Sequence, residues 1–443
     1  MTRAIAAVVL VGAFLAVIPM YAALTPEQRQ LSLQSFEYVW TAIRDKHWQT
    51  KPGGLDWQAI HDEFKPKIEA ADSLDAVRVV MSQMLARLHQ THFNIVPADL
   101  YSNVDASQGR EVTAGIDVRV IGASVLVTSV EPGSSAAAQG VRPGWEILKI
   151  ARVDLVPVVA QSNETYAGST LRDLMLRRTI LARLTVPGAL PGADDATESI
   201  AVEFLDGAGR HVVKTLAQAT PKGDLVQFGY LNPMHVWFSS SRVGGGRAGG
   251  AIGYVAFNAF LDPQRVMTSF GEAVQSCQTC DGFVVDLRGN PGGIGIMAMG
   301  MAAWFIAQPD QKLGTLYMRD DTLKFVVNPR VTTFSGPLAI LVDGASASTS
   351  EIMAEGLKDL GRARIFGTHT AGAALPSLFE KLADGDGFQY AIANYISEGG
   401  QPLEGLGVTP DVETPITREA LLAGKDPALD AAVAWIKQQK LAK

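Results

Sequence analysis

The chain has 443 residues, enough for two or three domains with a sizeable hydrophobic core. Its composition, with 47% hydrophobic and 19% charged residues, is that of a globular protein. The 45 acidic residues outnumber the 38 basic ones and give a net charge of −7, which argues against a general binder of nucleic acid or anionic membranes.

The segment 1–23 predicts export. Arg3 precedes an apolar run that ends near Ala23, and polar sequence follows. This is the layout of a secretory signal, although the run is also close to the length of a membrane helix, so an uncleaved anchor is the alternative. We therefore expect a periplasmic or extracellular protein, with a membrane as partner only if the segment is retained.

Residues 24–105 predict an all-helical region. The stretches SFEYVWTAIRDKHW and DAVRVVMSQMLARLHQTHF space their apolar residues three and four apart. Ser73 and Asp75 form a start signal for the second helix, and Pro97 breaks the pattern.

Residues 112–220 predict a β-rich domain. Alternating runs over 116–120 and 124–130 lead into a short alanine-rich helix, and a longer helix over 169–184 precedes a strand pair over 198–216. This order resembles a PDZ domain of the bacterial protease type. The resemblance implies a groove that adds a peptide as an extra strand and holds its carboxyl-terminus, with the lip at Ala114, Gly115 and Ile116. A β-domain without a ligand is the alternative.

Residues 225–443 predict an α/β layered domain around a buried sheet. Apolar strands alternate there with helices over 262–276, 294–306 and 348–360. The expected strands are AIGYVAF, DGFVVDLRG, PLAILVDG, RARIFG and FQYAIANY. The only cysteines, Cys277 and Cys280, either pair or are structural, because a zinc site would need two further ligands. We expect no metal and no cofactor.

Two of the predicted strand-to-helix turns carry groups suited to nucleophilic chemistry. In GFVVDLRGNPGG, Gly292 and Gly293 allow backbone N–H groups to point at a developing oxyanion. In PLAILVDGASASTSEIM, Ser346, Ser348 and Ser350 offer hydroxyls that need a neighbouring base to become nucleophilic. A glycine turn without a ligand and a serine that only caps a helix are the alternatives.

Together these turns resemble peptidase family S41, the tail-specific and tricorn-like serine proteases. The resemblance extends over the helical region, the PDZ-like region, VDLRGNPGG, the Ser-x-Ser-Glu turn and GVTPD. It implies a crotonase-like (ClpP-like) layered core with Ser348 as nucleophile. The amide of Thr349 and that of Gly292 or Gly293 would then form the oxyanion hole.

The resemblance places the catalytic base away from the serine turn. The branch with a Ser–Lys dyad keeps its lysine where this chain has Ala373, and the nearby Lys358 lies on a predicted helix face. In the tricorn-like branch a hydroxyl residue and then the catalytic histidine end the last N-terminal helix, and Thr91 and His92 match these positions. His369, the secondary candidate His89, and a site without a histidine base are the alternatives.

The same branch orients its histidine with a glutamate that precedes a Gly-Val-x-Pro-Asp sequence. Here the sequence LEGLGVTPD supplies Glu404, which would act through the hydroxyl of Thr91. The predicted activity is hydrolysis of peptide bonds in exported proteins or peptides through an acyl-enzyme, and the PDZ-like domain would either recruit substrate tails or gate the site. A non-catalytic ligand-binding protein on the same scaffold and a PDZ scaffold with a decayed protease domain are the alternatives.

Overall fold

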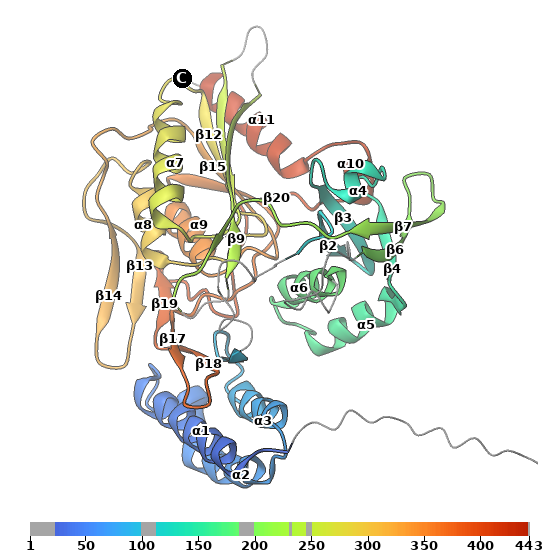
Figure 1. Cartoon of the computed structure of the whole chain (residues 1–443). Helices are drawn as coiled ribbons and strands as arrows, with labels where there is room; N and C mark the ends of the chain where they lie inside the picture. The colour runs from blue at the N-terminus through green and yellow to red at the C-terminus, as the bar shows by residue number, and fades with distance from the viewer. Residues whose placement is uncertain (1–22, 99–111, 186–198, 230–232, 245–249, 442–443) are drawn as a thin grey trace, which may run out of the picture.

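The computed structural model describes residues 23–98, 112–185, 199–229, 233–244 and 250–441, arranged as a helical bundle, a β-rich domain and an α/β core (Figure 1). Nearly all of the predicted export segment lies outside these ranges. Within them, no helix is both long and apolar enough to span a bilayer.

The helical bundle consists of α1 (Pro26–Lys46), α2 (Trp57–Ala70) and α3 (Leu74–Ala86), with a 3₁₀ turn, η1 (Pro52–Gly54), between the first two. Each helix begins at a side-chain cap, from Thr25, Asp56 and Ser73 respectively. The expectation that Thr91 and His92 end the last helix is wrong. Helix α3 stops at Ala86, and His89 and His92 both have positive φ values, of 50° and 63°, that no α-helix contains.

The β-rich domain forms a sheet in the strand order β2-β3-β4-β6-β7, and its helix α6 packs along the edge strand β2 (Figure 1). The strands and helices predicted over this region are present. Their bounds are β2 (Ile116–Ile121), β3 (Ser124–Val130), α4 (Ser135–Ala138), β4 (Glu146–Ile150), β5 (Val153–Asp154), α5 (Leu155–Thr165), α6 (Arg172–Leu184), β6 (Ser199–Leu205) and β7 (His211–Ala217).

The core domain is built on the sheet β10-β11-β12-β15-β16-β20, which is parallel except for the antiparallel pair β10–β11. Strands β12 and β15 are wholly buried, as expected of a parallel sheet covered on both faces. Phe283 and Val285 face the layer of α7, α8 and α9, whereas Val284 faces α11. The bounds are β10 (Phe238–Val243), β11 (Ile252–Phe257), α7 (Pro263–Gln275), β12 (Gly282–Asp286), α8 (Gly295–Ala302), β15 (Leu338–Val342), α9 (Thr349–Asp359), β16 (Ala363–Gly367), β20 (Val412–Glu413), α10 (Arg418–Leu422) and α11 (Pro427–Leu441).

Three smaller sheets surround this core: β14-β13-β19, β1-β18-β17 and the pair β8-β9. The single strand expected over FQYAIANY is in fact two strands, β18 and β19, which belong to different sheets. The bounds are β1 (Asn94–Val96), β8 (Asp224–Val226), β9 (Met234–Val236), β13 (Gln311–Tyr317), β14 (Thr322–Val327), β17 (Ser377–Lys381), β18 (Gly387–Ala391) and β19 (Asn394–Ser397).

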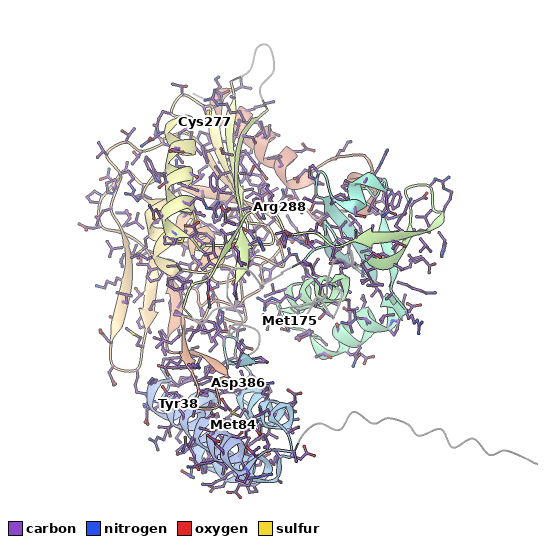
Figure 2. The ribbon with its side chains drawn as sticks, in the orientation of Figure 1. Tyr38, Met84, Met175, Cys277, Arg288 and Asp386 are labelled. Carbon is purple, nitrogen blue, oxygen red and sulfur yellow. A yellow bond between two sulfur atoms is a disulfide. The ribbon has the colours of Figure 1, made fainter. Side chains whose placement is uncertain are left out.

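The hairpin of β17 and β18 reaches out to the helical bundle and completes its hydrophobic core. Phe388 and Tyr390 are fully buried in one cluster with Phe36 and Met84. At this junction Arg78 forms a two-bond ion pair with the buried Asp386, which lies beside the bundle in Figure 2. The bundle is therefore anchored to the core domain rather than tethered by the chain alone.

Cys277 and Cys280 form a disulfide at the end of α7, where Figure 2 labels Cys277. The sequence left open whether the two cysteines pair, and the structure shows that they do.

Candidate active site

The three serines in the turn between β15 and α9 have different environments. Ser346 is buried and its Oγ donates to the carbonyl of Leu287 at 2.7 Å, while the buried Ser350 donates to the carbonyl of Asn290 at 2.9 Å. Both hydroxyls thus tie the turn to the neighbouring turn after β12. Ser348 is the only residue between 341 and 350 that is not buried.

Ser348 is held in an unusual backbone conformation at the start of α9. Its φ of 54° and ψ of −117° lie in a region that residues with a side chain rarely adopt. The carboxylate of the buried Glu351 accepts the Ser348 N–H at 2.9 Å, and also those of Gly372 and Ala373 at 2.7 and 3.0 Å. Burial raises the pKa of Glu351 to about 7 even though these hydrogen bonds act to lower it.

The glycine turn after β12 lies against Ser348 and Thr349. A Cβ added to Gly292 would come within 2.7 Å of the Ser348 Cβ and 2.8 Å of the Thr349 N, so only glycine fits there. The Gly292 N–H donates to Asn290 Oδ1 at 2.9 Å and is therefore not free for a substrate. In the described part of the chain, no acceptor is bound to the N–H of Gly293 or of Thr349.

The Thr349 side chain also fixes the orientation of this second glycine. Its Oγ1 donates to the Gly293 carbonyl at 2.9 Å. Of the two glycines that the sequence offered for an oxyanion hole, Gly293 is thus the one with an available amide.

Thr91, His92 and Glu404 form a continuous hydrogen-bonded chain. The Glu404 carboxylate accepts the Thr91 N–H at 2.7 Å and the Thr91 Oγ1–H at 2.8 Å, while Thr91 Oγ1 lies 2.7 Å from His92 Nδ1. A threonine hydroxyl has a single proton, so when it donates to Glu404 it must accept from Nδ1–H. The chain therefore assigns the proton to Nδ1 and leaves a lone pair on Nε2 of His92.

The electrostatic surroundings keep the imidazole neutral. Burial and then the positive charge of Arg178 lower the pKa of His92 to about 4, so the ring is unprotonated at neutral pH. Burial raises the pKa of Glu404, against the hydrogen bonds from Thr91 and Ala374 that favour its ionised form.

The segment around Ala373 connects His92 to the turn between β15 and α9 that carries Ser348, called the nucleophile turn below for its candidate nucleophile. The Ala373 N–H donates to Glu351, behind Ser348, and the next N–H, of Ala374, donates to Glu404 at 3.2 Å, behind His92. Ala373 thus contributes a backbone contact where the dyad branch would keep a lysine. Among the described residues no hydrogen bond joins Ser348 to His92 in this structure.

The other candidates have different environments. His369 is exposed, and its Nδ1 lies 3.4 Å from Thr409 Oγ1. His89, two positions before Thr91, is also exposed. Lys358 Nζ donates to the Thr409 carbonyl and pairs with Glu355, as expected of a helix-surface lysine. Across the ranges that are described, no group of three or more potential metal ligands is found.

The predicted peptide lip lies at the start of β2. Gly115 has a φ of 75°, and an added Cβ would lie 2.2 Å from the Ser134 Cβ, so the position requires glycine. Its N–H donates to Thr113 Oγ1, and Ala114 and Ile116 are buried. Strand β2 is at the edge of its sheet, but a role of this edge in binding peptides stays a prediction.

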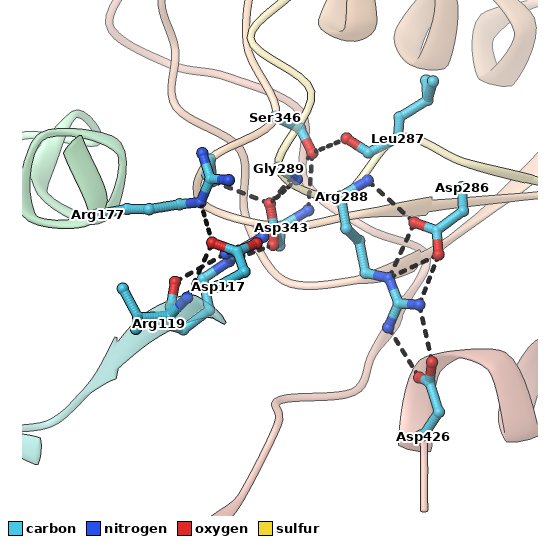
Figure 3. A network of polar contacts seen from close by, with 12 residues as sticks. Asp117, Arg119, Arg177, Asp286, Leu287, Arg288, Gly289, Asp343, Ser346 and Asp426 are labelled. Atoms are coloured by element: carbon cyan, nitrogen blue, oxygen red, sulfur yellow. Dashed lines mark hydrogen bonds and ion pairs between the residues drawn. The ribbon is translucent and has the colours of Figure 1, made fainter. Parts of the chain in front are cut away.

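The β-rich domain is joined to the nucleophile turn by a buried ionic network (Figure 3). Arg119 of β2 donates to Asp343 Oδ2 at 2.7 Å, and Asp343 Oδ1 accepts the Gly289 N–H at 2.8 Å. Asp117 pairs with Arg119 and with Arg177 of α6. Although burial acts to raise the pKa of Asp343, Arg119 holds it below its ordinary value.

A cavity of about 1010 Å³ lies at this junction. It is lined by Arg119, Asp343 and Arg288 but by none of Ser348, His92 or Glu404, so it is separate from the reacting groups.

Sequence reasoning did not assign roles to Glu351, Asn290, Arg119 or Asp343. Glu351 and Asn290 were visible inside the two motifs, and a carboxylate or amide next to a tight turn is a signal for backbone N–H binding. Nothing in the sequence pairs Arg119 with Asp343, which lie 224 positions apart.

Comparison with known proteins identifies the fold and the chemistry. A family model described as peptidase family S41 matches residues 251–414, and a model of the tricorn protease C1 domain matches residues 30–86. The chain carries a peptidase family S41 domain. It is accordingly a serine peptidase, and the two matches coincide with the core domain and the helical bundle.

This S41 peptidase resembles carboxyl-terminal-processing proteases along most of its length. It is 26% identical over 408 residues to the carboxyl-terminal-processing protease of Picosynechococcus sp., covering 88% of this chain and 84% of that protein. The solved photosystem II D1 C-terminal processing protease has 20% identity and a TM-score of 0.57, covering 93% of this chain and 97% of its own. Mature CPAF has 14% identity and a TM-score of 0.62, also covering 93% and 97%.

Proposed function

We propose that this S41 peptidase is an exported serine endopeptidase that uses Ser348 as nucleophile, His92 as general base and Glu404, acting through Thr91, to orient the histidine. The observation that carries the proposal is the hydrogen-bonded chain from Glu404 through Thr91 to His92 Nδ1. It provides a neutral imidazole with its Nε2 lone pair available, which is the form a general base requires.

The proposed reaction has two halves. His92 Nε2 takes the proton of Ser348 Oγ as the oxygen attacks the peptide carbonyl, and a tetrahedral oxyanion forms. The C–N bond then breaks as His92 returns the proton to the leaving amine, which leaves an acyl-enzyme. A water molecule attacks the ester carbonyl, gives its proton to His92, and Ser348 Oγ leaves with that proton restored.

The amides of Gly293 and Thr349 are the proposed oxyanion donors, because both N–H groups are free of acceptors within the described residues. The Thr349 amide is also at the amino end of α9, where the helix dipole favours negative charge. Because Ser348 and His92 are not hydrogen-bonded in this structure, the reaction requires them to approach when substrate binds.

The proposed substrates are proteins or peptides outside the cytoplasm that are cleaved near their carboxyl-terminus. The relatives' names describe carboxyl-terminal processing, and the β-rich domain offers an edge strand at which a tail would be added. No nucleic-acid partner and no cofactor enter the proposed reaction.

The test uses an internally quenched peptide and a fluorophosphonate probe. Ser348→Ala should lose the probe label and at least about 10³-fold in kcat, and His92→Ala should fall to a similar level. Ser346→Ala is the matched control for the hydroxyl. The Ser346→Ala variant loses the hydrogen bond to Leu287, so it should cleave the peptide more slowly, but it should keep the probe label. Full activity in Ser348→Ala, or a dead His369→Ala beside an active His92→Ala, would contradict the assignment.

A further inference from the structure

Helix α6 of the β-rich domain packs directly on the nucleophile turn. Leu174 shares a buried cluster with Ala345 and Ala347, the second of which is the residue before Ser348. The Asp173 side chain lies against Gly344, and the Arg177 guanidinium lies close to Gly289. This face of α6 is therefore an interface with the active site rather than a solvated surface.

Arg178 continues this face one helical turn beyond Leu174, because residues four apart in a helix lie above one another. Its guanidinium is close enough to His92 to contribute to the lowering of the imidazole pKa. Arg178 thus lies near His92, and it comes from a different domain.

Arg178 differs from Arg172 and Arg177 of the same helix in having no acidic partner among the described residues. Arg172 pairs with Asp173, and Arg177 pairs with Asp117. Among the residues that the structure describes, Arg178 makes no hydrogen bond and no ion pair with a carboxylate. Its side chain is exposed to solvent.

A cation of this kind favours an anionic ligand. A guanidinium has five N–H donors in a planar fork that matches a carboxylate. Because the Arg178 guanidinium has no carboxylate partner among the described residues, a carboxylate that reaches it gains a charge-assisted hydrogen bond without first displacing an ion pair.

We propose that Arg178 binds a carboxylate of the peptide substrate beside the catalytic residues, and that it makes the enzyme select chains with a negative charge close to the scissile bond. The proposal rests on the proposed function. The carboxylate comes either from the carboxyl-terminus of the substrate or from an Asp or Glu side chain, and these two sources present the same group to Arg178.

The experiment compares four internally quenched peptides of one parent sequence. Two peptides have a neutral residue near the cleaved bond, and their carboxyl-terminus is amidated in one and free in the other. The other two are amidated and have a glutamate or a lysine at that same position. The readout is the ratio of kcat/KM between charged and neutral peptides, because a purely structural change lowers all four values together.

The wild-type enzyme should cleave at least one anionic peptide about tenfold or more faster than the neutral one, in the range of a charge-assisted hydrogen bond. Arg178→Gln should bring that ratio close to one, and Arg178→Glu should invert the preference towards the lysine peptide. Arg183→Gln, an exposed arginine at the other end of the same helix, should keep the wild-type ratio. The free-carboxylate and glutamate peptides identify which source is selected.

Equal cleavage of all four peptides by the wild-type enzyme would overturn the proposal, as would a uniform loss in Arg178→Gln with the ratio unchanged. Both outcomes leave the serine mechanism standing provided that Ser348→Ala is inactive on every peptide. Activity retained in Ser348→Ala would instead contradict the proposed function.

Discussion

At the scale of single residues, the hydroxyl of Thr91 is the smallest group on which the proposed chemistry depends. Among the residues whose structure is described, it alone links the Glu404 carboxylate to His92 Nδ1. Without it the imidazole has no acceptor for its Nδ1 proton, so both its tautomer and its ring orientation become free.

Thr91→Val, which keeps the shape of the side chain, should therefore lower kcat by about 10²- to 10⁴-fold with little change in KM. Thr91→Ser should recover most of the activity because it restores the hydroxyl. Steady-state kinetics on one peptide, with thermal unfolding as a check of folding, measures both variants. An active Thr91→Val enzyme would mean that Glu404 does not act through this residue.

The residues proposed to react could be named from the sequence, but their conformations could not. Ser348, His92 and Glu404 follow from short motifs, whereas the positive φ of His92 and of Ser348 does not. The segment of His92 is held by a partner distant in the chain, Glu404 on the Thr91 N–H, whereas the Ser348 N–H is held by Glu351, three positions along α9. The residue types at the two positions do not by themselves predict a positive φ.

At the scale of elements, Glu351 holds the turn before α9 in place from inside the helix. Its two oxygens accept three backbone N–H groups and the Thr370 hydroxyl, and all four donors lie in the turn or in the 370–373 segment. A glutamine there would turn one oxygen into an NH₂ group that faces donors.

Glu351→Gln should consequently destabilise the protein by about 2–4 kcal/mol and strongly reduce activity, although Glu351 contacts no substrate in the proposed mechanism. Glu355→Gln is the matched control, one helical turn along α9 and paired with Lys358. It should destabilise the protein less than Glu351→Gln, because within the described residues no backbone N–H donates to the Glu355 carboxylate. Chemical denaturation and peptide cleavage measure the two effects, and equal stability of the two variants would contradict this role of Glu351.

The bounds expected from the sequence are wrong for one strand and one helix, and in both cases tertiary contacts end the element earlier than its apolar pattern does. The apolar pattern of FQYAIANY has no break, yet the chain passes there from the sheet of β1 to the sheet of β13. The pattern of α3 continues past Ala86, but Gln90 is bound to the buried His47, which draws the chain out of the helix. Periodicity reports burial along a segment, and it does not report which partner buries it.

At the scale of the whole molecule, the Arg119–Asp343 pair is the ionic contact that joins the β-rich domain to the nucleophile turn. Both side chains are nearly buried, at 12% and 10% exposure, so removing one leaves the other charge without its partner. Removing one member of a buried pair costs about 3–5 kcal/mol.

Arg119→Met should therefore weaken the docking of the β-rich domain. It should lower the unfolding temperature, broaden the transition or split it in two, and reduce peptide cleavage. Arg210→Met, which removes an arginine with 76% of its side chain exposed, is the control and should leave unfolding nearly unchanged. A single transition at the wild-type temperature in Arg119→Met would show that the domains are held together by other contacts.

The helical bundle and the hairpin of β17 and β18 share one hydrophobic core, and this has a consequence for the timing of activity. During synthesis the base emerges early, at residue 92, but the bundle cannot finish packing until the ribosome has made Phe388 and Tyr390. The acceptor behind Thr91 comes later still, at Glu404. A nascent chain therefore lacks the complete proposed site until Glu404 has been translated.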